Sequence, residues 1–550
     1  MMRTFQFLIV LLLALPISAQ TPAPEDLIRG VARISLMDGE VSVRRGDSGE
    51  WVAGVINAPL LTDDRIATGQ NSRAEVQFDA ANVLRIGGNA EIHLALLENG
   101  KYHIEIARGT VTFRTLRQGH ADIELNTPSV SVRPAMVGAV RISVTEAGES
   151  EITARAGDVE VFTPQGTQWI YSGQTMMARG SASDPEFQME DGIPQDDWDR
   201  WNESRDRAEE SNNSAQYVPP GVYGTGDLDN SGQWIYVQPY GYVWRPVGVA
   251  VGWAPYRNGR WVWINWYGWT WVSYDSWGWA PYHYGRWFFD ARWGWAWYPG
   301  GLGVTAYWSP ALVSFFGWGG GVGVGVGFGF ANIGWVPLAP YEAFHPWWGT
   351  AYAGGLNRGV SISNANITAI YRNARVANGI SGMAAGDFTA GRFGGIQRVS
   401  GAQVQSAGMI NGRLPLNPGI ASRRFSDRTV ASIPRGAMNT QFYSRSNSAN
   451  RSLSNTHLSG YHRFGEPGAA SPSNRSPQGG QQTGSFQRFG EPGSAQRLPP
   501  TQAWRNFGTP GGAVRGGRQP YNPPQNRPAP QRSAPPRASH PSAKAGGGRR

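Results

Sequence analysis

The side chains best placed for chemistry lie in two connecting segments of a tryptophan-rich stretch. They are Tyr256 and Arg257 in the first segment and Tyr282, His283 and Tyr284 in the second. Aromatic rings stack on the apolar faces of sugars, while Arg, Asn and Tyr side chains hydrogen-bond sugar hydroxyls. Because loops carry function more often than strand cores do, we expect these side chains to be exposed as a candidate site for cell-wall glycan.

The sequence gives little support for a catalytic or metal site. Residues 227–232 imitate the first half of a calcium loop, but the twelfth position is Gln238 instead of glutamate. The 8 His residues are scattered, and the absence of Cys excludes disulfides, thiol nucleophiles and thiolate metal sites. We predict no catalytic residue, cofactor or metal, and a protein that is not an enzyme. A wall-polymer hydrolase is a remote alternative, because glycosidase carboxylates need only spatial proximity.

The candidate residues belong to a repeat of 26–27 residues, each unit consisting of a strand, a turn, a strand and a Pro-containing connection. Each of the two strand patterns occurs three times. The first is found at 232–236, 259–263 and 285–289, and the second at 240–244, 267–271 and 293–297. Aromatic residues two apart share a face of a strand. A unit this short cannot close a core alone, so we expect the units to stack into one continuous sheet.

The tryptophans of this repeat admit two roles. Of the 24 Trp residues, 19 lie between residues 231 and 350. In the favoured role the rings form the core between hairpins, because their large apolar area lets a small, Gly-rich unit fold. In the other they form an exposed platform for sugars. Further on, residues 317–330 alternate Gly with bulky residues, which indicates a strand with one bare face that another element can approach closely.

Before the repeat, residues 28–180 show the pattern of a β domain. Apolar and charged residues alternate in short runs such as 40–44, 74–78, 103–106 and 140–144, and turn residues recur every 8–12 positions. Such alternation gives strands with one buried and one solvated face. We predict a β roll or sandwich, with no competing helical segment.

The order of short motifs in this region resembles a FecR-like domain. The opening is carried by residues 39–46, Trp51 and residues 61–69, and the middle by residues 72–78, 109–111 and 126–132. Residues 156–161 and 172–174 resemble the closing strands. One departure is Gly138-Ala139-Val140-Arg141, where the family often has a Gly-Thr-x-Phe strand.

The resemblance implies a fold and an extracytoplasmic role in binding a protein or in the envelope. Type members are periplasmic sensors of iron-siderophore signalling whose cytoplasmic part controls a sigma factor. After its first residues this chain shows neither the transmembrane helix nor the cytoplasmic helical part that signalling to a sigma factor needs, so sigma-factor regulation is not implied. The aromatic repeat, residues 221–345, resembles an uncharacterised module that often follows FecR-like domains in exported bacterial proteins, and that resemblance supplies no activity.

The ends of the chain predict export and a basic tail. Residues 1–19 have the pattern of a signal peptide, with Arg3, an apolar run from Phe5 to Leu15, Pro16 and a cleavage site after Ala19.

Residues 190–215 predict a helical linker. Residues 20–197 carry 15 basic and 26 acidic side chains, whereas residues 351–550 carry 25 basic and 4 acidic ones. We expect residues 346–440 to be a peripheral extension and residues 441–550 to be disordered.

These features together predict a mainly β, non-enzymatic cell-envelope protein, located in the periplasm, at the outer envelope or outside the cell. Its partners would be an envelope protein or a cell-wall polymer. The basic tail should be attracted to an anionic polymer, a lipid surface or the acidic domain of the same chain. Nucleic acid is a weaker option because the protein is exported. The tail also contains Arg-Phe-Gly-Glu-Pro-Gly twice, at 463–468 and 488–493, as binding motifs or as a simple duplication.

Overall fold

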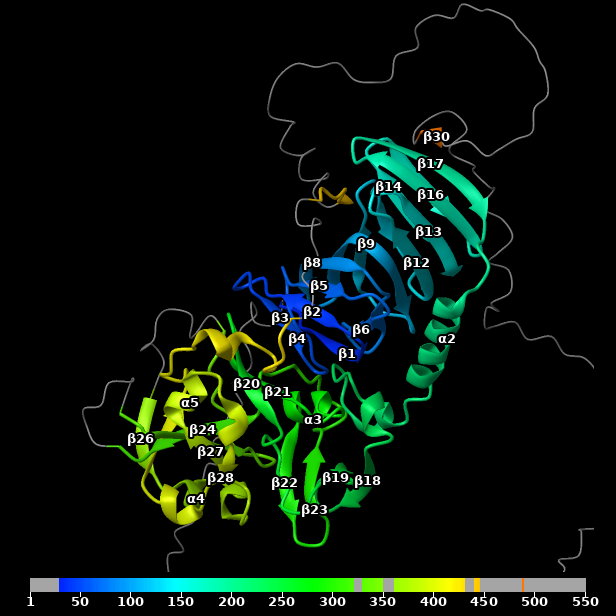
Figure 1. Ribbon diagram of the computed structural model, residues 1–550. Coiled ribbons are helices and arrows are strands. Elements are labelled where there is room, and N and C mark those ends of the chain that lie inside the picture. The colour runs from blue at the N-terminus through cyan, green and yellow to red at the C-terminus, as the bar shows by residue number, and fades with distance from the viewer. Residues whose placement is uncertain (1–28, 321–328, 350–360, 431–439, 446–486, 489–550) are drawn as a thin grey trace, which may run out of the picture. The chain divides into compact units, whose positions relative to one another are not determined.

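The structure is a computed structural model that describes residues 29–320, 329–349, 361–430, 440–445 and 487–488 (Figure 1). Strands outnumber helices throughout, so the prediction of a mainly β chain with a second β domain is confirmed. The predicted signal peptide and most of the predicted disordered tail lie outside the described residues.

The N-terminal β domain, residues 29–191, contains two sheets that share one long strand. The first half of β9 (Lys101–Thr115) pairs with β8 (Glu91–Glu98) and β10 (Asp122–Asn126), and its second half with β7 (Asn82–Ile86) and β12 (Gly138–Val144). The domain runs past residue 180, where the sequence placed its end. Its other strands are β1 (Ala32–Asp38), β2 (Val41–Arg44), β3 (Trp51–Ala53), β4 (Pro59–Leu60), β5 (Arg65–Thr68), β6 (Arg73–Gln77), β11 (Ser131–Arg133), β13 (Ser150–Ala156), β14 (Val159–Thr163), β15 (Gly166–Ile170), β16 (Gln174–Ser181) and β17 (Asp184–Asp191).

Gly109 lies where β9 passes from one sheet to the other. Its φ is +87°, and a Cβ atom at this position would come within 2.5 Å of the Cα atom of Ala90. Glycine is therefore required both by the backbone conformation and by the close approach. Aliphatic side chains then fill the space between the sheets, and the fully buried ones include Val43, Ile66, Ile86, Ile104, Val111 and Ile142.

Helix α2 (Asp197–Glu210) follows the domain and docks on it through ion pairs. The helix lies within the predicted helical linker, residues 190–215, and begins with Asp196 as the N-cap and Asp199 completing a capping box. Arg205 of the helix contacts the Oε1 atom of Glu75 at 2.8 Å, and Arg85 contacts the Oε2 atom at 2.9 Å. Burial alone would raise the pKa of Glu75, but the two guanidinium groups outweigh it and lower the pKa to about 2.

The tryptophan-rich module, residues 221–349, contains the three predicted hairpins. They are β18 (Gly232–Val237) with β19 (Gly241–Pro246), β20 (Gly259–Ile264) with β21 (Gly268–Ser273), and β22 (Arg286–Asp290) with β23 (Gly294–Tyr298). A short helix, α3 (Trp279–His283), lies between the second and third hairpins. Two 3-10 turns, η1 (Ser214–Tyr217) and η2 (Gly226–Leu228), precede the first hairpin.

The prediction of one continuous sheet is wrong. The first and third hairpins share a four-stranded sheet, joined at Trp244 and Trp297, whereas the middle hairpin forms a two-stranded sheet of its own. Every residue of β20 and β21 is buried. The middle hairpin is therefore enclosed, in part by the C-terminal segment, whose Phe388 packs on Trp261 and Trp269, and it makes no strand pairing with the other two hairpins.

The C-terminal segment, residues 361–430, completes a third sheet of six strands. It adds β26 (Ser361–Ala365), β27 (Ser381–Ala384), β28 (Gln397–Arg398) and β29 (Ala407–Asn411) to β24 (Val313–Trp318) and β25 (Asn332–Pro337). Helices α4 (Ile367–Ile370) and α5 (Ala385–Thr389) and the turns η4 (Asn373–Arg375), η5 (Phe393–Gly395), η6 (Gly401–Val404) and η7 (Ile420–Arg423) connect them. The expectation of a peripheral extension was thus wrong for these residues, since Phe388 of α5 is fully buried against Trp269.

Close packing against bare glycine occurs at the edge of the Gly-alternating stretch, whose centre lies outside the described residues. Phe330 covers Gly317 of β24 and Gly408 of β29. A Cβ atom on Gly317 would come within 2.2 Å of the Phe330 ring, and one on Gly408 within 2.4 Å. The predicted bare face of this stretch therefore admits a ring where any other residue would clash.

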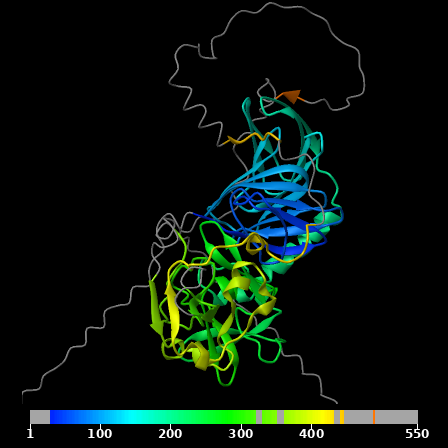
Figure 2. The same cartoon turned by 60° about the vertical axis from the view of Figure 1, so that its left-hand side comes forward.

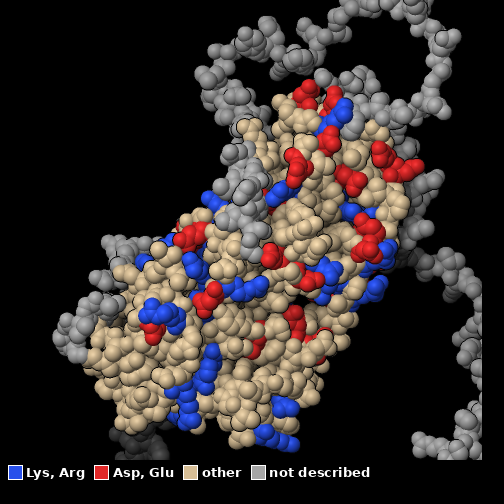
Figure 3. Space-filling view, viewed as in Figure 1, with Lys and Arg blue, Asp and Glu red and all other residues tan. Residues whose placement is uncertain are grey.

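Buried polar contacts join the N-terminal β domain to the module. Arg33, 2% exposed, contacts Asp227 at 2.6 Å, and the side chain of Asn57 donates to the carbonyl oxygen of Asp275 at 2.9 Å. Figure 3 shows acidic side chains over the N-terminal strands, whereas the visible face of the module is mostly uncharged. None of the helices in the described part of the chain has the length and apolar character needed to span a membrane.

Candidate functional site

The five side chains that the sequence singled out are not displayed as a platform. Tyr256, Tyr282 and His283 are fully buried, Tyr284 is 2% exposed, and Arg257 is half-buried. The expectation that they are exposed is therefore wrong. All five residues of α3, which forms part of the second connecting segment, are buried.

Tyr256 ties three parts of the module together. Its hydroxyl donates to the carbonyl oxygen of Tyr282 at 2.7 Å and accepts from the backbone N–H of Leu312 at 3.0 Å. Its own carbonyl oxygen accepts from the indole of Trp335 at 2.9 Å. Burial raises the pKa of Tyr256 above its usual range, so the phenol stays neutral and acts as a structural hydrogen-bonding group.

Arg257 and His283 are also held by backbone carbonyls. Arg257 donates to the carbonyl oxygens of Asn378 at 2.8 Å and Ile380 at 3.2 Å, which fixes the C-terminal segment on the module. The Nδ1 atom of His283 donates to the carbonyl oxygen of Ser309 at 2.7 Å. Burial lowers the pKa of His283 to about 3, so the imidazole is neutral at physiological pH and is no proton donor to a ligand.

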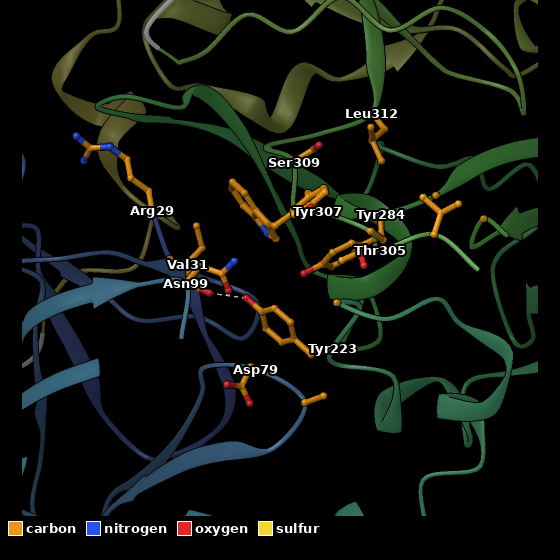
Figure 4. Close-up of a pocket in the computed structure, with 18 of the residues that line it drawn as sticks. Arg29, Val31, Asp79, Asn99, Tyr223, Tyr284, Thr305, Tyr307, Ser309 and Leu312 are labelled. Atoms are coloured by element: carbon orange, nitrogen blue, oxygen red, sulfur yellow. Dashed lines mark hydrogen bonds between the residues drawn. The ribbon is translucent and has the colours of Figure 1, made fainter. Parts of the chain in front are cut away.

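A cleft of about 1870 Å³ opens between the N-terminal β domain and the module. Figure 4 shows Asp79 and Asn99 on the side of the N-terminal domain and Tyr284, Thr305 and Tyr307 on the side of the module. Of the five predicted site residues, only Tyr284 lines this cleft. The sequence missed it because its walls come from segments about two hundred residues apart.

The module's side of the cleft is rich in aromatic rings. Tyr307 and Tyr341 are 45% and 75% exposed, and Trp308 is half-buried. Trp308 packs on the buried ring of Tyr267, with 5.0 Å between the ring centroids. Tyr223, which also lines the cleft, donates its hydroxyl to the carbonyl oxygen of Val31 at 2.5 Å. The run of Tyr307 and Trp308 in a Gly-rich loop outside the repeat was a sequence signal for this wall.

The polar groups of the cleft serve the fold or lie at its mouth. Asp79 accepts from the hydroxyl of Tyr102 at 2.7 Å and from the backbone N–H groups of Ala81 and Asn82 at 2.6 and 2.8 Å. Its oxygens are thus committed to a turn. Arg117 and His120 are exposed at the rim. Within the described ranges, no three His, Cys, Asp or Glu side chains are grouped to hold a metal ion.

A second aromatic surface lies on the first hairpin. Tyr236 and Tyr242 are 60% and 51% exposed, with ring centroids 5.5 Å apart, and Tyr217 lies 4.8 Å from Tyr242. The equivalent pair in the middle hairpin, Trp263 and Trp269, is buried. A tyrosine pair in the first unit where the second has tryptophans was the sequence signal for this difference.

Two stretches of the chain match known protein families. Residues 64–161 match the FecR protein family, and residues 225–342 match a family of unknown function, DUF6600. The chain thus contains a FecR domain followed by a separate uncharacterised domain, as the sequence resemblances predicted. No curated protein matches the chain.

Two solved structures are similar to part of the chain. Both are crystal structures of a "putative anti-sigma factor" from Parabacteroides distasonis, with 13% and 14% sequence identity and a TM-score of 0.21 each. Each match covers 23% of this chain, and the chain spans 59% of the solved chain.

Proposed function

We propose that this protein is an exported, non-enzymatic binding protein of the cell envelope that holds a cell-wall polysaccharide in the cleft between its two β domains. The observation that carries the proposal is the aromatic wall of the cleft, with Tyr307, Trp308 and Tyr341 at its surface. Ring faces bind the apolar faces of sugars, and phenol hydroxyls bind their hydroxyl groups.

The size of the cleft favours an oligomer or polymer over a small metabolite. Pockets for small molecules usually measure about 300–1,000 Å³, whereas this cleft measures about 1870 Å³. A glycan chain could lie along it with several rings in contact at once. The FecR domain would supply the opposite wall and the scaffold that keeps the cleft open.

The chemistry of the lining supports binding instead of catalysis. Asp79 is committed to hydrogen bonds within its own turn. Burial raises the pKa of two lining phenols, Tyr223 and Tyr284, above the usual range. These groups therefore keep one protonation state near neutral pH, whereas a general acid or base needs a pKa near the working pH.

Export is part of the proposal because of the signal-peptide pattern at residues 1–19. Fractionation of the producing cell, with the mature N-terminus determined by Edman sequencing, tests it. We expect an N-terminus at Gln20 and the protein in an extracytoplasmic fraction. An intact Met1 on cytoplasmic protein would contradict export and leave the binding proposal to be judged separately.

Cosedimentation with purified peptidoglycan and with other envelope polysaccharides tests the ligand. We expect Tyr307→Ala and Tyr341→Ala each to weaken binding about tenfold, since stacking one ring contributes about 0.5–1.5 kcal/mol and its lost area adds to that. The matched control is Tyr236→Ala, which removes an exposed tyrosine outside the cleft. Weak binding in the control with full binding in the cleft variants would move the site to the first hairpin.

The same preparations test for enzymatic activity. The polymer is incubated with the wild-type protein, and soluble saccharide fragments are measured over hours against a buffer control. We expect no release. Release that disappears in the Tyr307→Ala variant would overturn the non-enzymatic part of the proposal and identify the remote alternative, a hydrolase, at the same cleft.

A further inference from the structure

The outer edge of β17, in the N-terminal β domain, contacts the tail of the same chain. Along one side, β17 pairs with β16 over its whole length. The antiparallel ladder starts where Gln174 of β16 lies opposite Asp191 of β17 and ends where Ser181 lies opposite Asp184. On its other side it pairs with β30 (Gln487–Arg488), an antiparallel strand in which Arg488 lies opposite Glu186 and Gln487 opposite Phe187. Figures 1 and 2 both place β30, in orange, beside the end of this sheet.

Arg488 is the first residue of a repeated sequence. Arg-Phe-Gly-Glu-Pro-Gly occurs at 463–468 and at 488–493, and the similarity extends two residues further back, to Tyr461-His462 and Phe486-Gln487. Each copy therefore reads aromatic, polar, Arg, Phe and then Gly-Glu-Pro-Gly. The first four residues alternate as a strand does, and the Gly-Glu-Pro-Gly that follows is typical of a turn that ends it.

We propose that β17 is an acceptor edge for the second tail hexad, Arg-Phe-Gly-Glu-Pro-Gly at 488–493, and that this hexad, with the two residues before it, adds to the edge of the same chain as an antiparallel strand. Exposed strand edges are pairing hazards that proteins cover, and strand addition supplies affinity through backbone hydrogen bonds. The proposal is independent of glycan binding in the cleft.

Charge is matched where the two strands meet, because Arg488 lies opposite Glu186. β17 carries Asp184, Glu186, Glu190 and Asp191, in a region of net charge −11 over residues 20–197, whereas residues 351–550 have a net charge of +21. Opposite charge on the tail and on the edge promotes their encounter.

A second tail segment anchors the chain to the same domain. Arg445 donates its backbone N–H to Glu124 at 2.9 Å and contacts Asp122 through its side chain at 3.4 Å. The hydroxyl of Ser444 donates to Glu124 at 2.8 Å. Because Ser444 and Arg445 contact β10, the chain that follows them is tethered to this domain, which raises its effective concentration at the edge of β17.

Disulfide trapping in the full chain tests the proposal, and the absence of native Cys makes it clean. Glu186→Cys is combined with Arg488→Cys, the opposed pair, whose Cα separation in an antiparallel ladder suits a disulfide. The matched control combines Glu186→Cys with Arg475→Cys, an arginine between the two hexads. Crosslinks are detected by mobility on non-reducing gels and located by peptide mapping.

We expect the opposed pair to form an intramolecular disulfide at least tenfold faster than the control pair. A synthetic peptide of residues 485–493, added in excess, should slow that crosslink, whereas a scrambled peptide should not. Equal rates for both pairs would overturn the proposal. A crosslink that forms only between two chains, and that rises with protein concentration, would overturn pairing within one chain and assign the edge to a second copy.

Discussion

The two β domains of this chain solve the same packing problem with different side chains. The N-terminal domain fills its core with aliphatic residues such as Ile104 and Val111 and also buries Glu75 and Arg85 as partners. The module, residues 221–349, carries five Arg and five acidic side chains and fills its core with indoles, eight of which are among the largest fully buried side chains. The comparison shows that Arg and Glu side chains can be buried only with a partner of opposite charge. Aromatic rings need no such partner, because most of their surface is apolar.

Some of the buried indoles of the module are also held by backbone carbonyls. The indole N–H of Trp287 donates to Pro281 at 2.8 Å, and that of Trp297 donates to Tyr284 at 2.8 Å. These acceptors are backbone carbonyls of α3 and the residue that follows it. A short, Gly-rich repeat thereby obtains a core without disulfides, since every buried ring contributes apolar area and some, such as Trp287 and Trp297, add a directional bond. By contrast, the indole N–H groups of four others have no hydrogen-bond partner among the described residues, namely those of Trp261, Trp269, Trp271 and Trp279.

The largest effect is expected at the centre of the aromatic core. Trp261 lies 4.8 Å from Phe315 and 5.3 Å from Trp271 between ring centroids, and it is fully buried. Trp261→Ala should lower the free energy of unfolding of the module by about 4 kcal/mol, because it leaves a large cavity. Urea unfolding measured by circular dichroism checks this. Trp169→Ala, at a site 45% exposed, is the control, and an equal loss there would contradict a core held by rings.

A smaller loss is expected in the N-terminal domain when one partner of its buried ion pairs is removed. Glu75→Gln should cost about 3 kcal/mol, because Arg85 would remain buried with its charge only partly compensated. The control is Asp38→Asn, which breaks the exposed pair with Arg73 and should cost less than about 1 kcal/mol. Hydrogen exchange in β6 and β7 measures both. A change at Glu75 no larger than at Asp38 would show that this domain, too, is held by apolar packing alone.

Acidification should act on the two domains in opposite directions. Burial lowers the pKa of His283 to about 3 and raises the pKa of Asp64 to about 6. In the unfolded chain His283 has a pKa of about 6.5, so below that pH the unfolded chain binds a proton that the folded module does not bind. The module should therefore lose about 2 kcal/mol of stability between pH 7 and pH 5. Folding favours the protonated form of Asp64, so the N-terminal domain should gain about 1 kcal/mol over the same interval.

Hydrogen exchange resolved by strand measures this divergence, with β20 and β21 reporting on the module and β2 and β5 on the N-terminal domain. Arg33 faces His283 and disfavours its charging, while Arg45 partly offsets the burial of Asp64. His283→Gln should reduce the pH dependence of the module, where burial also raises the pKa of Asp275. Asp64→Asn should reduce that of the N-terminal domain, where burial also raises the pKa of Glu91 and lowers that of His103. Parallel loss of protection in both domains would contradict the two assignments.

The sequence predicted elements better than it predicted their assembly. The N-cap of α2 at Asp196 and the three hairpins follow from local rules, because capping and alternation involve only neighbouring residues. The burial of Tyr256 does not, since its hydroxyl is satisfied by Leu312 and its carbonyl by Trp335. The cleft was missed for the same reason: the periodicity of one strand does not say which distant loop will face it.

The smallest effect is expected at the first hairpin, where both Tyr236 and Tyr242 are exposed. Tyr242 is 51% exposed, whereas Trp269 at the equivalent position of the middle hairpin is covered by Phe388, with ring centroids 4.5 Å apart. Tyr242→Ala should therefore cost less than about 1 kcal/mol, the contribution of its stacking on Tyr217 and Tyr236. Urea unfolding compares it with Trp269→Ala, which should cost about 4 kcal/mol. Equal losses would mean that the repeat units are energetically alike, and that covering by the C-terminal segment does not distinguish the middle hairpin from the first.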